Sequence, residues 1–400
     1  MRAGSWPSTL LVLAFAVIIA ACHGKTIVLV ADIANAFSVS PAHASWVVSA
    51  VAVIAALASP LVNWIVAHIG ERRAIAIGLV IAAGSSFLGS LADNFNALLA
   101  LRVVEGAGYI SVVLSALALL IHTTEGERRT RALAFWSVAS PLGGAIAIFL
   151  VSPLVGHNWR LAFSGHAVIL LALLLFTPLL PAANLASRGE RKPLAQVFDI
   201  YRNPSIWRLA LAVGAPLTLA LGLVTIVPNY FIKTLGIAPP VIGVISTVGI
   251  LSSVVAGIFA GFILTRRIGA YFVIAGALIG LALEILVFIP GIDASTAIAA
   301  KIAQGFFSSF VTAWVFTSIP KMSARGDVMG AGGIAEQFLY LSMFLGPVLL
   351  FPLFALPSRL PLFAAMAVAN LLPLLLLPLN LRRPARSDDG AVALGPNNAT

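Results

Sequence analysis

Long apolar stretches, each bounded by short polar segments, repeat along the whole chain. Breaking these stretches at charges, Gly and Pro gives twelve segments. A helix needs about 20 apolar residues to cross the hydrocarbon core of a bilayer, and the segments are near that length. We therefore predict an all-α membrane protein with twelve transmembrane helices. The predicted spans are 9–33, 45–68, 73–92, 95–121, 131–155, 161–181, 206–231, 238–264, 269–290, 294–319, 328–352 and 358–380.

The composition favours a bilayer over water as the solvent of this chain. Hydrophobic residues make up 60% of it and charged residues 10%, whereas a soluble domain is about half apolar and a quarter charged. The net charge of +10 could suggest nucleic acid, but the basic residues lie in the short loops between apolar segments. We therefore predict a multi-pass protein of the inner (cytoplasmic) membrane, with the lipid bilayer as a partner and no nucleic acid.

The distribution of basic residues predicts the orientation of the chain. With the N-terminus in the cytoplasm, 18 of the 24 Lys and Arg residues fall in inner loops and tails and 3 in outer loops. Cytoplasmic loops of membrane proteins are enriched in Lys and Arg. This bias predicts that both termini are cytoplasmic and that the number of spans is even.

The longest inner connection divides the chain into two halves of six spans. It covers residues 182–205 and is polar and basic. We predict an N-terminal six-helix bundle over 1–181, a cytoplasmic linker over 182–205, a C-terminal bundle over 206–381 and a disordered cytoplasmic tail over 382–400. Two similar bundles joined by one long loop are typical of transporters built from parallel repeats.

The start of the chain allows a second interpretation. Arg2, the apolar run after it and the sequence Ile19-Ala-Ala-Cys22 resemble a lipoprotein signal. The apolar pattern continues beyond Cys22, and cleavage there would invert the charge bias. We therefore interpret this segment as the first membrane helix.

Three short motifs in the expected spans resemble the major facilitator superfamily. Residues 102–108, Arg-Val-Val-Glu-Gly-Ala-Gly, resemble its Arg-x-x-x-Gly-x-Gly motif in the fourth span. Residues 140–144, Ser-Pro-Leu-Gly-Gly, resemble the fifth-span Gly-Pro-x-x-Gly-Gly motif associated with proton-coupled antiporters. Residues 159–163, Trp-Arg-Leu-Ala-Phe, resemble an element of drug-exporter-like members. The resemblance implies rocker-switch alternating access between two bundles.

The fifth-span motif and the loop after the second span suggest gating positions. Pro141, Gly143 and Gly144 would let the fifth span bend and pack tightly, because Pro removes a backbone hydrogen bond. In the loop, Gly70 and Arg72 match the family's Gly-x-x-x-Asp-Arg-x-Gly-Arg-Arg motif. The motif's Asp and first Arg are here Ala67 and His68, and in the fifth span Trp136, Ser140 and Ala145 replace Gly.

Seven ionisable residues are predicted to lie at membrane depth, where each costs at least about 2.5 kcal/mol and needs a partner or water. They are Lys25, Asp32, Arg102, Glu105, Glu284, Lys301 and Glu336.

Four of these seven fall in the first and fourth spans, which face each other in the resembled fold. Lys25 and Asp32 are two helical turns apart and are predicted to share one face. We predict an Asp32–Arg102 pair that couples proton binding to helix movement, with Lys25 reaching Glu105 or a substrate anion. The alternative is that these groups only hold helices together, with Glu105 bound to Arg102 one turn away.

The other three lie in the C-terminal half. For Glu284 and Lys301 we favour a mutual salt bridge. Glu336 follows a glycine-rich helix start and is the second candidate for proton coupling, beside Asp32, Arg102 and Glu105. Gln337 next to it, together with Lys25, Arg102 and Lys301, is a candidate for substrate binding.

Two transport functions fit these residues. The first is proton-coupled export of a small amphipathic compound or metabolite, with protons as the coupling ion. The alternative is a proton symporter that imports a small organic anion, with Lys25, Arg102 and Lys301 supplying positive charge. We predict a monomer that is not an enzyme and has no cofactor. His23, His68 and His166 lack metal-ligand spacing, and no phosphate-binding loop or nucleophile–base arrangement is visible.

Overall fold

The computed structural model describes residues 4–181, 193–323 and 328–379, and the described chain is helical. The predicted tail over 382–400 and the first part of the linker lie outside these residues. The α-helices are α1 (Trp6–Ile27), α2 (Val30–Ala36), α3 (Pro41–Ala44), α4 (Trp46–Ser49), α5 (Ala52–Ile69), α6 (Glu71–Ser90), α7 (Phe95–Thr123), α8 (Gly126–Val151), α9 (Arg160–Leu174), α10 (Pro204–Lys233), α11 (Pro239–Ile263), α12 (Gly269–Val287), α13 (Ala294–Met322), α14 (Val328–Ala355) and α15 (Leu360–Leu376). The described residues also contain the 3-10 segments η1 (Ser152–Leu154), η2 (Thr177–Leu179) and η4 (Leu194–Arg202).

Polar residues at the loop ends start several of the long helices. Asn94 accepts the backbone N–H of Ala97 at the start of α7. Asp293 accepts the N–H of Thr296 at the start of α13, and its hydrogen bonds with Ser295 and Thr296 hold the pKa of that exposed carboxyl below its ordinary value. Such caps satisfy N–H groups that the first helical turn leaves without a partner.

In the described chain, ten helices are long and apolar enough to cross a membrane. Two shorter apolar helices, Arg160–Leu174 and Leu360–Leu376, stand where the sixth and twelfth spans were predicted. The multi-span membrane architecture is therefore confirmed at the level of ten long apolar helices, whereas twelve crossings stay a prediction.

The first predicted span is wrong as one continuous helix. α1 ends at Ile27, a turn follows, and α2 begins at Val30. Asp32 consequently lies in the first turn of a separate short helix. Lys25 and Asp32 therefore lie on two separate helices and do not share one face of a continuous helix as predicted.

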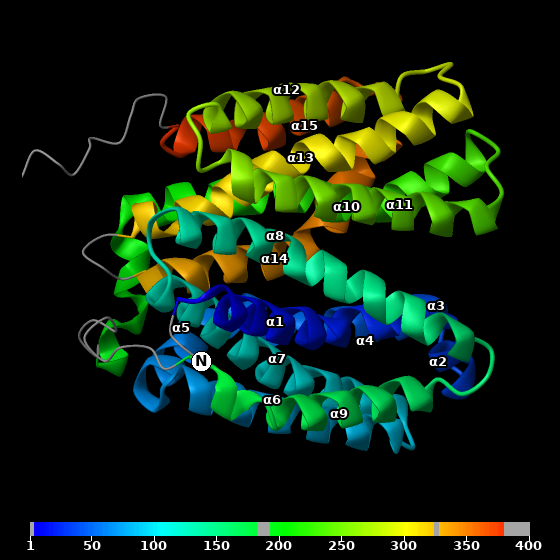
Figure 1. Ribbon diagram of the computed structural model, residues 1–400. Helices are drawn as coiled ribbons and strands as arrows, with labels where there is room; N and C mark the ends of the chain where they lie inside the picture. Colours follow the sequence, from blue (N-terminus) through cyan, green and yellow to red (C-terminus); the bar gives the residue numbers. More distant parts are fainter. Residues whose placement is uncertain (1–3, 182–192, 324–327, 380–400) are drawn as a thin grey trace, which may run out of the picture.

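The helices form two groups that lie side by side in Figure 1, with α1–α9 in one and α10–α15 in the other. We call the end of the helices where α9 ends and α10 begins the linker end, on the left in Figure 1, and the opposite end the far end. One hydrophobic core contains residues of both groups, such as Leu117, Ile319 and Ala335. Two further cores at the far end each belong to one group only. The groups therefore share packing mainly toward the linker end.

Small residues permit close helix approach within and between the groups. A Cβ on Gly143 of α8 would collide with the carbonyl oxygen of Val17 in α1. Gly257 and Gly261 of α11 pack against Val138 and Phe135 of α8, across the boundary between the groups. The tight packing predicted at Gly143 is confirmed, and the missing side chains of all three glycines let the helices approach closely.

Candidate functional site

A buried charge cluster joins α1, α7 and α9 inside the N-terminal group. The Lys25 ammonium contacts Glu105 Oε1 and Ser86 Oγ at 2.6 Å each, and His166 Nδ1 at 3.1 Å. Lys25 and Glu105 are each about 1% exposed. The contact of Lys25 with Glu105, one of the two predicted possibilities, is confirmed. With these three acceptors, the three N–H groups of the ammonium are all used.

Arg102 completes this cluster from the other side of the carboxylate. Its Nη1 donates to Glu105 Oε2 at 2.5 Å, and its Nη2 and Nε donate to the carbonyl oxygens of Cys22 and Val47 at 2.7 and 3.0 Å. The Phe163 ring lies 4.5 Å from the Lys25 ammonium. Two cations thus share one carboxylate in a dry site, so loss of Glu105 would leave both of them buried without a counter-ion, at a cost of several kcal/mol.

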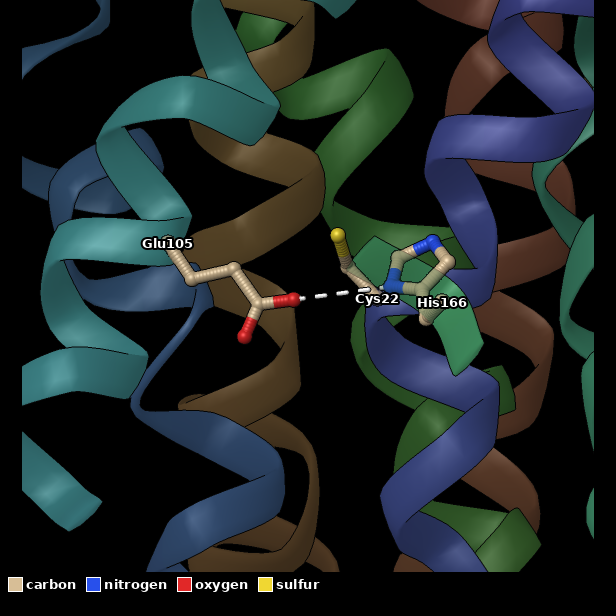
Figure 2. Close-up of side chains that lie close together, drawn as sticks. All are labelled: Cys22, Glu105 and His166. Atoms are coloured by element: carbon tan, nitrogen blue, oxygen red, sulfur yellow. Dashed lines mark ion pairs between the residues drawn. The ribbon is translucent and has the colours of Figure 1, made fainter. Parts of the chain in front are cut away.

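Three side chains of this region could in principle hold a metal ion. Figure 2 shows Cys22, Glu105 and His166, whose possible ligand atoms all lie within 4.8 Å of one another. The Lys25 ammonium already contacts two of the three. A metal cation would have to displace that ammonium, and the positive charge of Arg102 on the same carboxylate would repel it. Metal binding at this position is therefore electrostatically unfavourable.

The predicted Asp32–Arg102 pair is wrong. The Asp32 carboxylate accepts the backbone N–H of Gly156 at 3.0 Å, beyond the end of α8. Arg102 instead binds Glu105 and two backbone carbonyls. The alternative, in which Glu105 pairs with Arg102 one turn away, is confirmed. Asp32 lies beyond the break after Ile27, in a separate short helix, so the pairing predicted from one continuous helix is not formed.

A second buried carboxyl group lies where the two groups of helices meet. Glu336 of α14 is 2% exposed, and its Oε1 accepts the indole N–H of Trp136 of α8 at 3.1 Å. Trp136 stands where the resembled family motif has Gly. The contact therefore links the two groups through an acidic side chain and an uncharged donor.

Aromatic residues continue this junction. The hydroxyl groups of Tyr109 in α7 and Tyr340 in α14 are hydrogen bonded across the groups. The His23 ring of α1 stacks on Tyr340, with centroids 5.7 Å apart, and meets Tyr109 edge-on at 4.7 Å. A polar, aromatic seam thus runs between the two groups beside Glu336.

Gln337 has protein partners on both sides of its amide. Its Nε2 donates to the carbonyl oxygen of Ala56 in α5 at 3.0 Å, and its Oε1 accepts the Tyr201 hydroxyl of η4. The amide predicted to bind substrate therefore takes part in contacts within the protein.

The favoured Glu284–Lys301 salt bridge is wrong as a direct pair. Lys301 donates to Gln304 at 2.9 Å, and Gln304 donates to Glu284 at 3.3 Å. The second Glu284 oxygen accepts the side-chain amide of Asn370 in α15 at 2.8 Å. Gln304, one helical turn after Lys301, thus bridges the two ionisable side chains by hydrogen bonds within the C-terminal group.

The predicted gating residues lie at the linker end and along α8. Gly70 has a φ of 88° in the turn between α5 and α6, a conformation that favours glycine. Arg72 donates to the carbonyl of Leu180. The neighbouring Glu71 pairs with His122 at 3.2 Å. Pro141 lies inside α8, followed by Gly143 against α1. These contacts stay within the N-terminal group.

The long apolar helices, arranged in two groups that meet along this seam, define a polytopic membrane protein. The chain belongs to the Major Facilitator Superfamily, which it matches over residues 10–283. It is a multi-span protein homologous to bacterial inner-membrane efflux proteins.

Relatives and solved structures agree with this assignment. The chain is 30% identical over 135 residues to the multidrug export protein EmrB of Haemophilus influenzae, covering 33% of this chain and 26% of EmrB. It is 34% identical over 126 residues to the cephamycin export protein CmcT of Amycolatopsis lactamdurans, covering 31% and 24%. The matched segments thus span about a quarter of these relatives.

Two solved transporters share the fold over nearly the whole chain. The human organic anion transporter MFSD10 superposes with a TM-score of 0.78 at 16% identity, covering 93% of this chain and 100% of that one. The proton:xylose symporter XylE superposes with a TM-score of 0.69 at 13% identity, covering 92% and 93%. At these identities the likeness concerns the fold alone.

Sequence reasoning missed most partners of the charged groups. In the sequence, Trp136 is only a departure from the family motif, and Ser86, Gln304 and Asn370 are not predicted as partners. Apart from the contact of Gln304 with Lys301 one helical turn away, these partners lie 20 or more residues from the ions that they bind. Two signals were available: Trp136, a large side chain with an N–H donor at a position where the family has glycine, and Gln304, which lies three residues after Lys301 on one helix.

Proposed function

We propose that this protein is a proton-coupled exporter of small amphipathic compounds that works by alternating access as a monomer. In this proposal, twelve helices cross the membrane, both ends are cytoplasmic, and two six-helix bundles joined by the 182–205 linker rock against each other. Support comes from the family membership and from the packing, since the two groups share a core mainly toward the linker end.

The observation that carries proton coupling is the contact between Glu336 and Trp136. A charged carboxylate is expensive at membrane depth, so its charge state depends on what binds it. A hydrogen bond from an N–H group to an ionised carboxylate is about twice as strong as a hydrogen bond to a neutral acceptor. Protonation of Glu336 would therefore weaken a contact that joins the two groups, and proton binding would bias their movement.

The buried charge cluster has a supporting role in this proposal. Lys25 and Arg102 are both occupied by Glu105 and other acceptors. They keep α1, α7 and α9 together as one unit that moves as a whole. Import of an organic anion would need some of this positive charge to be available, so the occupied cluster favours export over the symporter alternative.

Proteoliposomes test the proposal directly. Vesicles that contain pyranine, with an acidic interior, receive ethidium outside, and exchange of dye for protons raises the internal pH. We expect exchange by the wild type and its loss in Glu336→Gln. Glu284→Gln is the matched control, because this carboxyl is also buried but binds residues of the C-terminal group only. Acidification that requires both external benzoate and the protein, beyond that of protein-free vesicles, with no response to ethidium, would instead establish anion symport.

A further inference from the structure

The last part of the connection between the two groups contacts both of them. The segment η4 (Leu194–Arg202) comes directly before α10 and contacts α5 of the N-terminal group as well as α10. Val197 is buried, and Ile200 and Tyr201 pack against the core that the two groups share. The segment is therefore seated on the junction at the linker end.

A proline provides the acceptor on the N-terminal side of this junction. Pro60 lies inside α5 and has no backbone N–H, so the carbonyl group of Ala56, four residues earlier, receives no helical hydrogen bond from it. The Gln337 amide of α14 donates to that carbonyl oxygen at 3.0 Å. A backbone carbonyl group that lacks its helical hydrogen bond in the N-terminal group thus accepts one from a side chain of the C-terminal group.

Tyr201 sets the direction in which Gln337 points. Its hydroxyl donates to Gln337 Oε1, which leaves the NH₂ side of the amide facing Ala56. Burial raises the pKa of Tyr201, so the hydroxyl stays a donor across the physiological range. The Trp207 indole N–H donates to the Tyr201 carbonyl at 2.7 Å, and the Phe198 ring stacks on the Tyr201 ring. The tyrosine is therefore held from both sides.

We propose that Tyr201, Gln337 and the freed carbonyl of Ala56 form a clasp that holds the two groups together at the linker end, and that this clasp must open in every transport cycle. The proposal rests on alternating access as the proposed function. It assigns Gln337 and Tyr201 as positioning residues that set the balance between the joined and the parted states. Neither residue needs to touch the substrate.

The test measures the distance between the groups without any substrate. Spin labels are attached to Glu127→Cys at the start of α8 and Arg267→Cys between α11 and α12, both exposed at the linker end. The native Cys22 is buried. Pulsed electron–electron double resonance on the protein in lipid nanodiscs gives the distribution of distances between the two labels. The short and long distances in it give the populations of the joined and the parted states.

We expect Tyr201→Phe to raise the ratio of parted to joined molecules about fivefold, since this is what the loss of one ordinary hydrogen bond does to a two-state ratio. Gln337→Leu should raise it further, because it removes both bonds. Pro60→Ala should act in the same direction, because the restored N–H competes for the Ala56 carbonyl. The matched controls are Tyr271→Phe on α12, an exposed tyrosine, and Pro228→Ala in α10.

Unchanged distance distributions in Tyr201→Phe and Gln337→Leu, in samples that elute as a single folded peak, would overturn the clasp. Tyr201→Phe removes a single oxygen atom, so it covers the case in which Gln337→Leu does not fold. A shift in the distances without any dye–proton exchange by the wild type would leave the clasp standing and refute the proposed function. Dye–proton exchange by the wild type with unaltered distances in the variants would refute the clasp and leave the proposed function standing.

Discussion

The indole N–H of Trp136 lies 3.1 Å from the carboxyl oxygen of Glu336, and this hydrogen bond connects α8 to α14 across the boundary between two groups of helices. The two residues are 200 positions apart in the sequence. Each sits on a helix that also packs against its own group, α8 on α1 and α14 on α10. A change in the strength of this bond is therefore felt by both groups.

Trp136→Phe keeps a large ring in place and removes the donor. We expect proton-coupled exchange to fall at least about tenfold, because a hydrogen bond to a charged group contributes about 1.5–3 kcal/mol. The pyranine assay measures this change. Trp314→Phe is the control for lost volume, since Trp314 is equally buried in the shared core. Equal losses in the two variants would show that packing and not the hydrogen bond is responsible.

The long apolar helices, which hydropathy alone determines, agree with the prediction from the sequence. Most of the predicted partners of the charged groups differ from those in the structure. Long apolar runs such as the one that forms α7 leave a helix as the one way to satisfy the backbone in lipid. The break after Ile27 lies in the run Ile-Val-Leu-Val-Ala, which contains no Gly, Pro or charge to signal it. Once that break is missed, Asp32 is assigned to the wrong partner.

Asp32→Asn is expected to leave proton-coupled exchange close to that of the wild type. The asparagine side-chain oxygen can still accept the N–H of Gly156, so the contact beyond α8 is kept. Exchange in proteoliposomes is measured over a range of external pH for both proteins. A complete loss of coupling in Asp32→Asn would restore the role that the sequence suggested for this carboxylate, and Asp93→Asn controls for the loss of one acidic group elsewhere.

Glu105→Gln is expected to destabilise the protein more than Lys25→Met. The first change leaves Lys25 and Arg102 buried without a carboxylate, at a cost of about 3–5 kcal/mol. The second leaves Glu105 with Arg102, which still balances its charge. Thermal unfolding in detergent, followed by tryptophan fluorescence, measures the order of the two. The reverse order would mean that Lys25 and not Glu105 holds the cluster together.

The α1–α8 contact allows a comparison of two adjacent glycines. A Cβ at Gly143 would collide with the Val17 carbonyl oxygen and come within 2.8 Å of the Ala20 side chain, whereas at Gly144 it would meet no atom within 4 Å. Gly143→Ala is therefore expected to destabilise the protein by about 1–3 kcal/mol, as overpacking typically does.

Gly144→Ala adds the same methyl group one residue later and should be tolerated. In a helix it should even stabilise slightly, since alanine has the higher helix propensity. Thermal unfolding and dye–proton exchange are measured for both variants, because the same contact could serve packing, movement or both. Normal stability with lost exchange in Gly143→Ala would show that α1 and α8 must slide past each other during transport. Two equally harmless substitutions would contradict the close approach of these helices.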